Sequence, residues 1–122
     1  MNEEILEMCD GTVHRETVEK VRGSMPDEEK LQDVAELFKL FGDFTRSRII
    51  SALVRSELCV CDIAELLGMS PSAVSHQLRI MRHMRVAKSR REGRTVYYSI
   101  ADEHMAKIFD MAFEHVSEEG QI

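Results

Sequence analysis

Two cysteines separated by a single residue, Cys59 and Cys61, lie where the sequence is expected to begin a helix. Thiolates bind soft and borderline ions such as Zn²⁺ and Cd²⁺. Side chains two positions apart point about 200° away from each other on a regular helix, and two ligands do not fill a tetrahedral shell. The pair can therefore share an ion only on an irregular first turn, and only with ligands from elsewhere.

The candidates for those further ligands are Cys9 and His14, near the N-terminus. Together with the Cys59–Cys61 pair they would give three sulfurs and one nitrogen, a set suited to Cd²⁺, Pb²⁺ or Zn²⁺. The chain has three cysteines, an odd number, and we expect no export signal, which favours reduced thiols or metal ligands over disulfides. The alternative for Cys61 is a small buried hydrophobic residue of the helix.

A second set of metal-binding side chains lies near the C-terminus and comprises Asp102, His104, His115 and Glu118. The two histidines are roughly 16 Å apart along a helix, so they share a face but cannot bind one ion within one chain. When two copies of this helix cross antiparallel about a two-fold axis, residues that meet have a constant sum of residue numbers, and the pairs 104/115 and 102/118 give 219 and 220. Each of the two resulting sites would hold two imidazoles and two carboxylates, which suits Zn²⁺ or Co²⁺. The alternative is that all four are ordinary surface residues.

Basic residues are concentrated in one segment, from Ser70 to Tyr98. Seven of them against one acidic residue, Glu92, give the segment a charge of +6, so the rest of the chain carries −12 within the total of −6. A basic block on an acidic body holds phosphates on one face and repels them elsewhere, which favours nucleic-acid binding. Without a motif, such a run would be read as a solvated surface.

A helix-turn-helix motif is predicted at the start of this block. A helix over residues 60–67 ends at Gly68, and a second helix over residues 71–84 begins with Ser70 as its cap and Pro71 in its first turn. In this layout the second helix lies in the major groove with its early side chains on the base edges. The candidate DNA-reading residues are Ser72, Ser75, His76, Gln77 and Arg79. The predicted packing face consists of Ala73, Val74, Leu78, Ile80 and Met81.

Two short β-like runs follow, over residues 86–90 and 95–100, and they are predicted to form a hairpin joined by residues 91–94. A hairpin attached to a helix-turn-helix is a wing. Its tip is expected to place Arg90, Arg91 and Arg94 against backbone phosphates. These arginines could equally be solvated charges, but the coincidence of the basic block with the motif favours phosphate contact.

The other elements are helical. Residues 31–41 repeat apolar side chains at spacings of three and four. Asp43 or Thr45 can cap the next helix, which is expected to bury Ile49, Ile50, Ala52, Leu53 and Val54. A last helix from about residue 101 carries an apolar stripe that is wide enough for both a core contact and a dimer interface.

The length of 122 residues and the hydrophobic content of 43% indicate one compact domain. We expect a mobile N-terminal arm or weak helix over residues 1–30, a winged helix-turn-helix domain for DNA binding and dimerisation over residues 31–118, and a tail over residues 119–122. The fold class is mainly α with a small β-hairpin, and the chain is expected to act as a homodimer.

Several classes of protein are not expected. No run approaches the roughly 18 apolar residues of a membrane span, and the acidic N-terminus is unlike an export signal, so we expect a cytoplasmic protein without a membrane partner. An enzyme is not expected, because the sequence shows no nucleophile with a partnered base, and the metal ligands leave no open coordination position.

Four segments of the chain are distinctive: Phe41-Gly-Asp-Phe-Thr-Arg46, Glu57-Leu-Cys-Val-Cys-Asp-Ile63, Ser72-Ala-Val-Ser-His-Gln-Leu-Arg79 and Arg90-Arg-Glu-Gly-Arg-Thr-Val-Tyr-Tyr98. Together they resemble the ArsR/SmtB family of metal-responsive repressors, over about residues 31–118. The resemblance implies a homodimeric winged helix that binds double-stranded operator DNA without metal and leaves it when metal binds. It also implies control of genes for metal efflux or sequestration.

The resemblance bears on both ligand sets. The cadmium- and lead-sensing branch of the family uses arm cysteines with a Cys-x-Cys pair, which Cys9, Cys59 and Cys61 match. This chain departs from that pattern in having one arm cysteine, with His14 where a second thiol is expected. The zinc-sensing branch uses a terminal-helix set that is matched here by Asp102, His104, His115 and Glu118. In the family, one site type can be regulatory and the other silent.

Two other functions fit the same residues. A thiol-based redox or persulfide sensor would use Cys9 with Cys59 or Cys61, and it would respond to oxidant in the presence of a chelator. A metal-buffering protein would have no sequence-specific affinity for DNA and no use for the arginines at residues 90–94.

Overall fold

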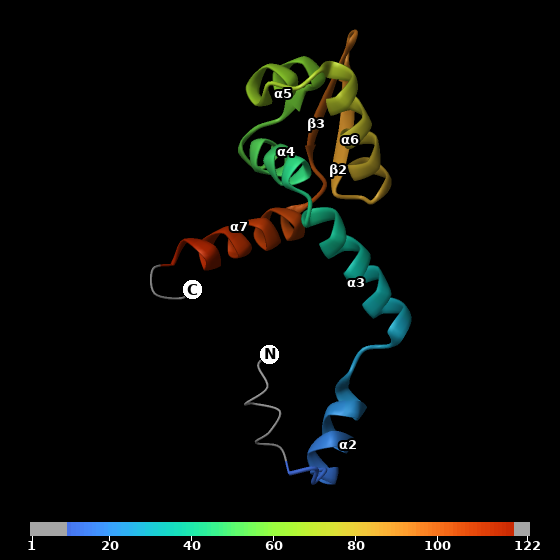
Figure 1. Cartoon of the computed structure of the whole chain (residues 1–122). Helices are drawn as coiled ribbons and strands as arrows, with labels where there is room; N and C mark the ends of the chain where they lie inside the picture. The colour runs from blue at the N-terminus through green and yellow to red at the C-terminus, as the bar shows by residue number, and fades with distance from the viewer. Residues whose placement is uncertain (1–9, 119–122) are drawn as a thin grey trace. The chain divides into compact units, whose positions relative to one another are not determined.

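The computed structural model describes residues 10–118, which divide into one unit that ends at Val34 and a second that begins at Ala35 (Figure 1). In chain order the elements are α2 (Arg15–Ser24), α3 (Glu28–Phe41), α4 (Phe44–Arg55), β1 (Leu58–Cys59), α5 (Val60–Leu67), α6 (Pro71–His83), β2 (Ala87–Glu92), β3 (Thr95–Ile100) and α7 (Glu103–Ser117). Within the described part of the chain, none of the helices combines the length and the apolar character needed to cross a bilayer.

Helix α2 forms part of the segment that was predicted to be an arm or a weak helix. Glu16 in its first turn and Arg22 in its last turn complement the helix dipole. None of its ten residues is buried, and Val21 and the following Met25 expose apolar side chains. The predicted domain boundary at residue 30 falls inside α3 and stays a prediction.

The first turn of α4 is a junction between helices. Of the two predicted caps, Asp43 is the one observed: its carboxylate accepts a hydrogen bond from the Arg46 N–H at 2.9 Å. Three consecutive side chains of α4 then donate to carbonyls at the ends of neighbouring helices: Arg46 Nε to Leu40 (3.0 Å), Ser47 Oγ to Phe41 (2.9 Å) and Arg48 Nη2 to Leu67 (2.9 Å). Helix-end carbonyls have no partner within their own helix, so these bonds fasten α3 and α5 to α4.

The helix-turn-helix has the capping residues that its sequence predicts. Helix α5 ends at Gly68, which has a left-handed backbone with φ of +67°. Ser70 caps α6 by accepting a hydrogen bond from the Ala73 N–H at 3.1 Å, and Pro71 is the first residue of that helix. Local signals of this kind fix where α5 stops and where α6 starts.

The sheet has three antiparallel strands in the order β1-β3-β2. The β2–β3 hairpin was predicted, but β1 was not, because a strand of two residues shows no alternation in the sequence. Strand β2 continues to Glu92, which leaves a two-residue turn with Gly93 at φ of +63°. The predicted four-residue tip is therefore wrong: Arg90 and Arg91 lie in β2, and only Arg94 lies in the turn.

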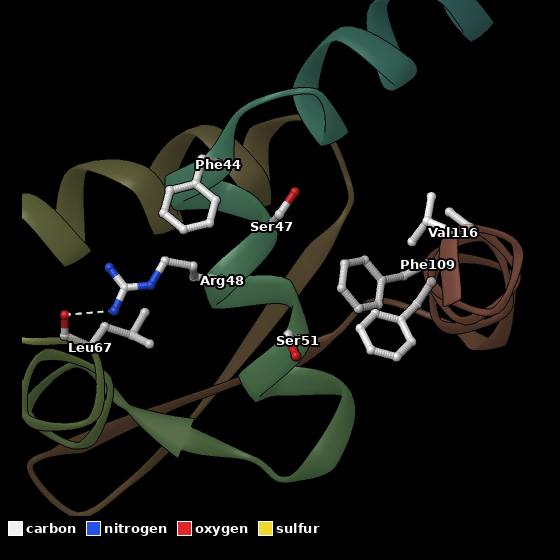
Figure 2. A pocket seen from close by; sticks show the side chains of 9 residues that line it. Phe44, Ser47, Arg48, Ser51, Leu67, Phe109 and Val116 are labelled. Carbon is white, nitrogen blue, oxygen red and sulfur yellow. Dashed lines mark hydrogen bonds between the residues drawn. The ribbon is translucent and has the colours of Figure 1, made fainter. Parts of the chain in front are cut away.

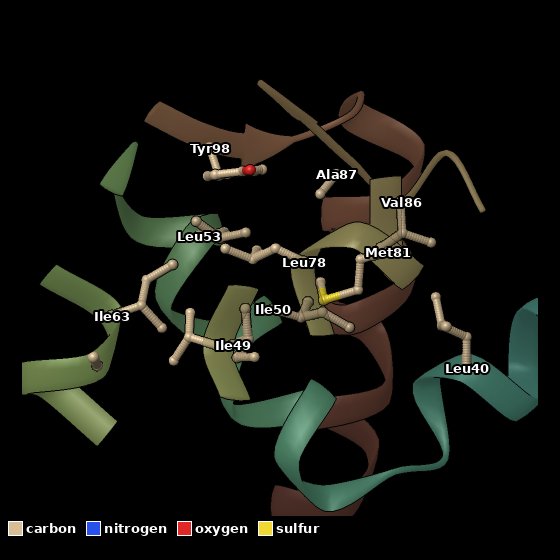
Figure 3. Packing of buried hydrophobic residues seen from close by; sticks show 12 residues of the cluster. Leu40, Ile49, Ile50, Leu53, Ile63, Leu78, Met81, Val86, Ala87 and Tyr98 are labelled. Carbon is tan, nitrogen blue, oxygen red and sulfur yellow. The ribbon is translucent and has the colours of Figure 1, made fainter. Parts of the chain in front are cut away.

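The hydrophobic core lies among α4, α5, α6 and the sheet, with Leu40 added from the end of α3 (Figure 3). Its largest fully buried side chains are Ile49, Ile50, Ile63, Val74, Leu78, Met81 and Val86. Ala73, which was predicted to pack, is exposed, because burial on α6 follows positions 74, 78 and 81. A helix-turn-helix followed by a hairpin that packs on the same core is the predicted winged arrangement.

Candidate metal sites and nucleic-acid interface

The thiol pair lies at the junction of β1 and α5. Cys59 ends β1 and is the N-cap residue of α5, with an extended backbone (φ −90°, ψ 171°), and its N–H donates to the Asp62 carboxylate at 3.1 Å. The hydrogen bond from this N–H lowers the pKa of the Asp62 carboxyl, and a smaller contribution in the same direction comes from the Cys59 side chain. Cys59 is half-buried and Cys61 is exposed, so the alternative of a buried Cys61 is wrong. The pair occupies the irregular helix start that joint coordination requires.

The ligands predicted to complete that site are placed only in part. His14 is exposed and is the N-cap residue of α2. Its side chain makes no capping hydrogen bond with the backbone of that helix. Cys9 lies outside the described residues. Within residues 10–118, the structure brings no three His, Cys, Asp or Glu side chains close enough together to hold a metal ion.

The terminal-helix set forms two separate pairs in one chain, as the helical rise requires. Asp102 caps α7 by accepting from the Met105 N–H at 3.1 Å, and its Oδ1 lies 3.6 Å from His104 Nδ1. His115 lies in the last turn of α7 and Glu118 is its C-cap residue. All four of these side chains are exposed. The structure thus unites Asp102 with His104 at one end and leaves the other pair at the opposite end.

The five candidate reading residues on α6 differ in their surroundings: Ser72, His76 and Arg79 are exposed, whereas Ser75 and Gln77 are half-buried. Arg79 Nη1 donates to Ser75 Oγ at 3.4 Å. Gln77 Oε1 accepts from Arg46 Nη1 at 3.4 Å, so the side chain of Gln77 is engaged within the protein. Of the five candidates, Ser72, His76 and Arg79 therefore have the side chains most open to solvent.

The wing arginines also differ. All three are exposed, and they differ in their partners. Arg90 makes a two-pronged ion pair with Glu57, from Nε to Oε2 at 2.8 Å and from Nη2 to Oε1 at 2.7 Å, and Arg90 Nη1 donates to Glu92 at 2.8 Å. The Glu57 carboxylate raises the pKa of Arg90, and Arg90 in turn lowers the pKa of Glu57. Arg90 is thus tied within the sheet.

Sequence reasoning did not single out three residues that position this surface. Arg46 holds Gln77, Glu57 holds Arg90, and Arg82 Nη1 donates to Ser89 Oγ at 3.0 Å, which ties α6 to β2. Arg46 and Glu57 do occur in the segments that carry the family resemblance. Their partners lie about thirty positions away in the chain, so spacing alone gives no signal for these bonds.

A capped recognition helix beside a hairpin with exposed arginines defines the class of winged helix-turn-helix DNA-binding proteins. The sequence profile "Bacterial regulatory protein, arsR family" matches residues 43–89, from the cap of α4 into β2. The chain belongs to this arsR family of transcriptional regulators. It is 46% identical to the Transcriptional repressor SmtB homolog of Synechocystis sp. (strain ATCC 27184 / PCC 6803 / Kazusa), over 96% of this chain and 89% of the relative.

Two further comparisons support the same assignment. The chain is 37% identical to the Cadmium resistance transcriptional regulatory protein CadC homolog of Staphylococcus aureus, over 95% of this chain and 97% of the relative. The solved structure of a homodimeric winged helix-turn-helix DNA-binding domain from Mycobacterium bovis matches with a TM-score of 0.68 and 27% identity, over 92% of this chain and 97% of that one. The predicted family and the predicted fold class are confirmed.

Proposed function

We propose that the protein is a metal-sensing repressor that binds operator DNA as a homodimer without metal and is released by Zn²⁺, Cd²⁺ or Pb²⁺. The observation that carries the proposal is the placement of Cys59 and Cys61 at the start of α5, the helix that precedes the recognition helix with its exposed Arg79. The name of the cadmium-resistance relative supports a role in controlling metal efflux or resistance genes. A repressor of this kind acts in the cytoplasm.

The dimer is supported by an apolar surface on α7 and α4. Met111, Phe113 and Val116 of α7 are 70%, 58% and 60% exposed, and Phe44 of α4 is 78% exposed. Phe44, Phe113 and Val116 line a hollow of about 530 Å³, which also includes Leu67 at the end of α5 (Figure 2). Exposed apolar patches of this kind mark interaction surfaces. A second copy of the chain is the proposed occupant, as in the homodimeric relative.

The first proposed metal site spans that dimer. An antiparallel pair of α7 helices would bring Asp102 and His104 of one subunit to His115 and Glu118 of the other. Two imidazoles and two carboxylates suit Zn²⁺ or Co²⁺, and the bound ion supplies a link between subunits. Operator binding needs two recognition helices about 34 Å apart, so fixing the subunits in another arrangement lowers the affinity for DNA.

The second proposed site uses Cys59 and Cys61 with Cys9 and His14. Three sulfurs and one nitrogen favour soft or borderline ions, Cd²⁺ and Pb²⁺ among them. The exposure of Cys61 and the extended backbone of Cys59 support this use of the pair. A ligand held here lies directly at the base of the helix-turn-helix.

A thiol-based redox or persulfide sensor is the second candidate function. The half-buried Cys59 and the exposed Cys61 are both free thiols, which is the observation that favours it. One measurement distinguishes the redox sensor from the metal sensor. A redox sensor releases DNA on addition of oxidant with EDTA present, whereas a metal sensor does not.

The test is a metal titration of operator binding. The metal-free protein first selects its preferred DNA from a random pool, and the affinity for that DNA is then measured with increasing Zn²⁺ or Cd²⁺. Wild type is compared with two double variants, Cys59→Ser/Cys61→Ser and His104→Ala/His115→Ala. We expect metal to weaken operator binding in the wild type by about 5- to 150-fold, the usual range of coupling between two ligands.

The double variant that loses this response while keeping metal-free DNA binding identifies the controlling site. A wild-type protein whose operator affinity is unchanged by either metal would rule out the proposed function. A protein that selects no DNA sequence at all but still binds metal would be the metal-buffering alternative.

A further inference from the structure

A row of residues crosses the sheet from the thiol pair to the wing. Cys59 of β1 is the register partner of Tyr97 of β3, and Tyr97 is the register partner of Arg90 of β2. The Arg90 guanidinium lies 4.8 Å from the centre of the Tyr97 ring, a distance at which a cation and an aromatic face attract each other. Only one strand therefore separates Cys59 from Arg90.

Arg90 also reaches across that strand to the segment that carries Cys59. Arg90 Nε and Nη2 donate to the Glu57 carboxylate, and Arg90 Nη1 donates to Glu92. All three guanidinium nitrogens therefore donate within the protein. Glu57 lies two positions before Cys59, and residues two apart in extended chain point to the same side. The two-pronged geometry makes this pair specific in direction as well as in charge.

The attachment matters because β1 is short. Its two residues pair with Tyr98 and Tyr97 of β3, and β1 makes no backbone pairing with β2. The Glu57–Arg90 ion pair adds a direct connection from the residue that precedes β1 to β2, and β2 leads into the turn that holds Arg94. A displacement of β1 at Cys59 therefore has a route to the wing through side chains.

We propose that Glu57 and Arg90 are a positioning pair that couples the state of the Cys59–Cys61 pair to the wing, and that Arg90 is not a phosphate contact. This inference rests on the function proposed above. The next residue along β2, Arg91, is exposed and serves as the phosphate contact on that strand. Two adjacent arginines with the same charge thus have different tasks.

The experiment uses Cd²⁺ as the probe and compares wild type with Glu57→Gln, Arg90→Gln and the matched control Arg91→Gln. Three quantities are measured for each full-length protein. They are the affinity for the selected DNA without metal, the dependence of that affinity on salt, and the fold-loss of affinity on adding Cd²⁺. Cd²⁺ binding to the thiols is followed separately, by the ultraviolet absorption of the cadmium–thiolate bond.

We expect Glu57→Gln and Arg90→Gln to bind Cd²⁺ through the thiols as wild type does but to lose most of the Cd²⁺-induced release, which is about 5- to 150-fold in a typical coupled system. A Glu57→Gln/Arg90→Gln double variant should lose no more than either single variant, because each substitution breaks the same pair. Arg91→Gln should lower the slope of log affinity against log salt by about one, because a phosphate contact is removed, and should keep the Cd²⁺ response.

Two results would overturn the positioning role. In one, Arg90→Gln lowers the salt slope as Arg91→Gln does, which would make Arg90 a phosphate contact. In the other, both pair variants release DNA with Cd²⁺ as fully as wild type, and the function proposed above then stands without the coupling. A wild-type protein that does not respond to Cd²⁺ overturns the coupling together with cadmium sensing, and it is recognised before any variant is compared.

Discussion

The Nη1 atom of Arg46 lies 3.4 Å from the Oε1 atom of Gln77, so the first turn of α4 holds the middle of the recognition helix. The Nε atom of the same guanidinium donates to the Leu40 carbonyl at the end of α3. One side chain therefore joins three helices, and the orientation of α6 depends on a residue outside the helix-turn-helix.

Replacing Arg46 with alanine should lower the free energy of unfolding by about 1–3 kcal/mol, because a part-buried carbonyl and the Gln77 amide both lose their partner. Urea denaturation followed by circular dichroism measures this loss. Gln77→Ala removes only one of the two bonds and should cost less. Equal losses in the two variants would contradict the role of Arg46 as a junction.

Gly68→Ala should destabilise the protein by about 1–2 kcal/mol, because an alanine must adopt the left-handed backbone of this position. A Cβ added at Gly68 meets no atom within 4 Å, so the cost comes from the backbone alone. Gly23→Ala is the matched control: Gly23 is helical, its Cβ would also lie in open space, and alanine should there be neutral or stabilising. Thermal unfolding of the two variants and of wild type measures the difference in stability.

Arg79 and Arg94 should differ in how they contribute to DNA binding. Arg79 is an exposed residue of α6, and Arg79→Ala should reduce discrimination between the preferred sequence and a single-base mismatch by about 1–3 kcal/mol. Arg94 lies in the wing turn, and Arg94→Ala should weaken binding to all sequences alike and lower the salt slope by about one. Competition binding with matched and mismatched duplexes tests both statements. An Arg94 variant that changed base preference would contradict this division.

Mixed dimers test whether the terminal-helix site is shared between subunits. A dimer that combines one His104→Ala subunit with one His115→Ala subunit keeps both histidines at one of its two sites, whereas each homodimer of a single variant keeps them at neither. We therefore expect mixed dimers, purified with two different tags, to regain Zn²⁺ binding at one site and part of the Zn²⁺-induced release. Mixed dimers that bind no more Zn²⁺ than the parent homodimers would show that the ligands do not meet across the interface.

Tyrosine emission should report on the thiol pair. The chain contains two tyrosines and no tryptophan, and Tyr97 is the register partner of Cys59. In a Tyr98→Phe variant, Cd²⁺ should change the emission of Tyr97, and Cys59→Ser/Cys61→Ser should abolish the change. An equal change without the thiols would mean that Cd²⁺ acts on Tyr97 from another site.

The sequence predicted the helix-turn-helix well because its signals are local. Gly68, Ser70 and Pro71 each act within a few residues, and the buried positions 74, 78 and 81 follow the helical period. The hairpin was predicted for the same reason, although its turn was placed too early. Because the turn has only two residues, the sequence contains no clear signal that separates the end of β2 from the start of the turn.

The contacts that position the site could not be predicted from such local signals. Glu57 and Arg90 are 33 positions apart, and Arg46 and Gln77 are 31 apart, so each pair meets only after the chain has folded. For that reason the sequence predicted Arg90 as a phosphate contact at the wing tip and gave no sign of its pairing with Glu57. The spacing of His104 and His115 did predict that one chain cannot unite them, and the two ends of α7 are indeed separate.

Helix α7 holds no buried residue among Glu103–Ser117, and α2 holds none among Arg15–Ser24. Met105 and Phe109 of α7 pack against the core from outside, but the exposed polar side chains of both helices can be replaced without removing a buried group. The residues that do form the core lie mainly between Leu40 and Tyr98. Single mutations at the proposed metal-binding side chains of α7 would therefore leave the core of the helix-turn-helix intact, so the preferred ion could change independently of DNA binding.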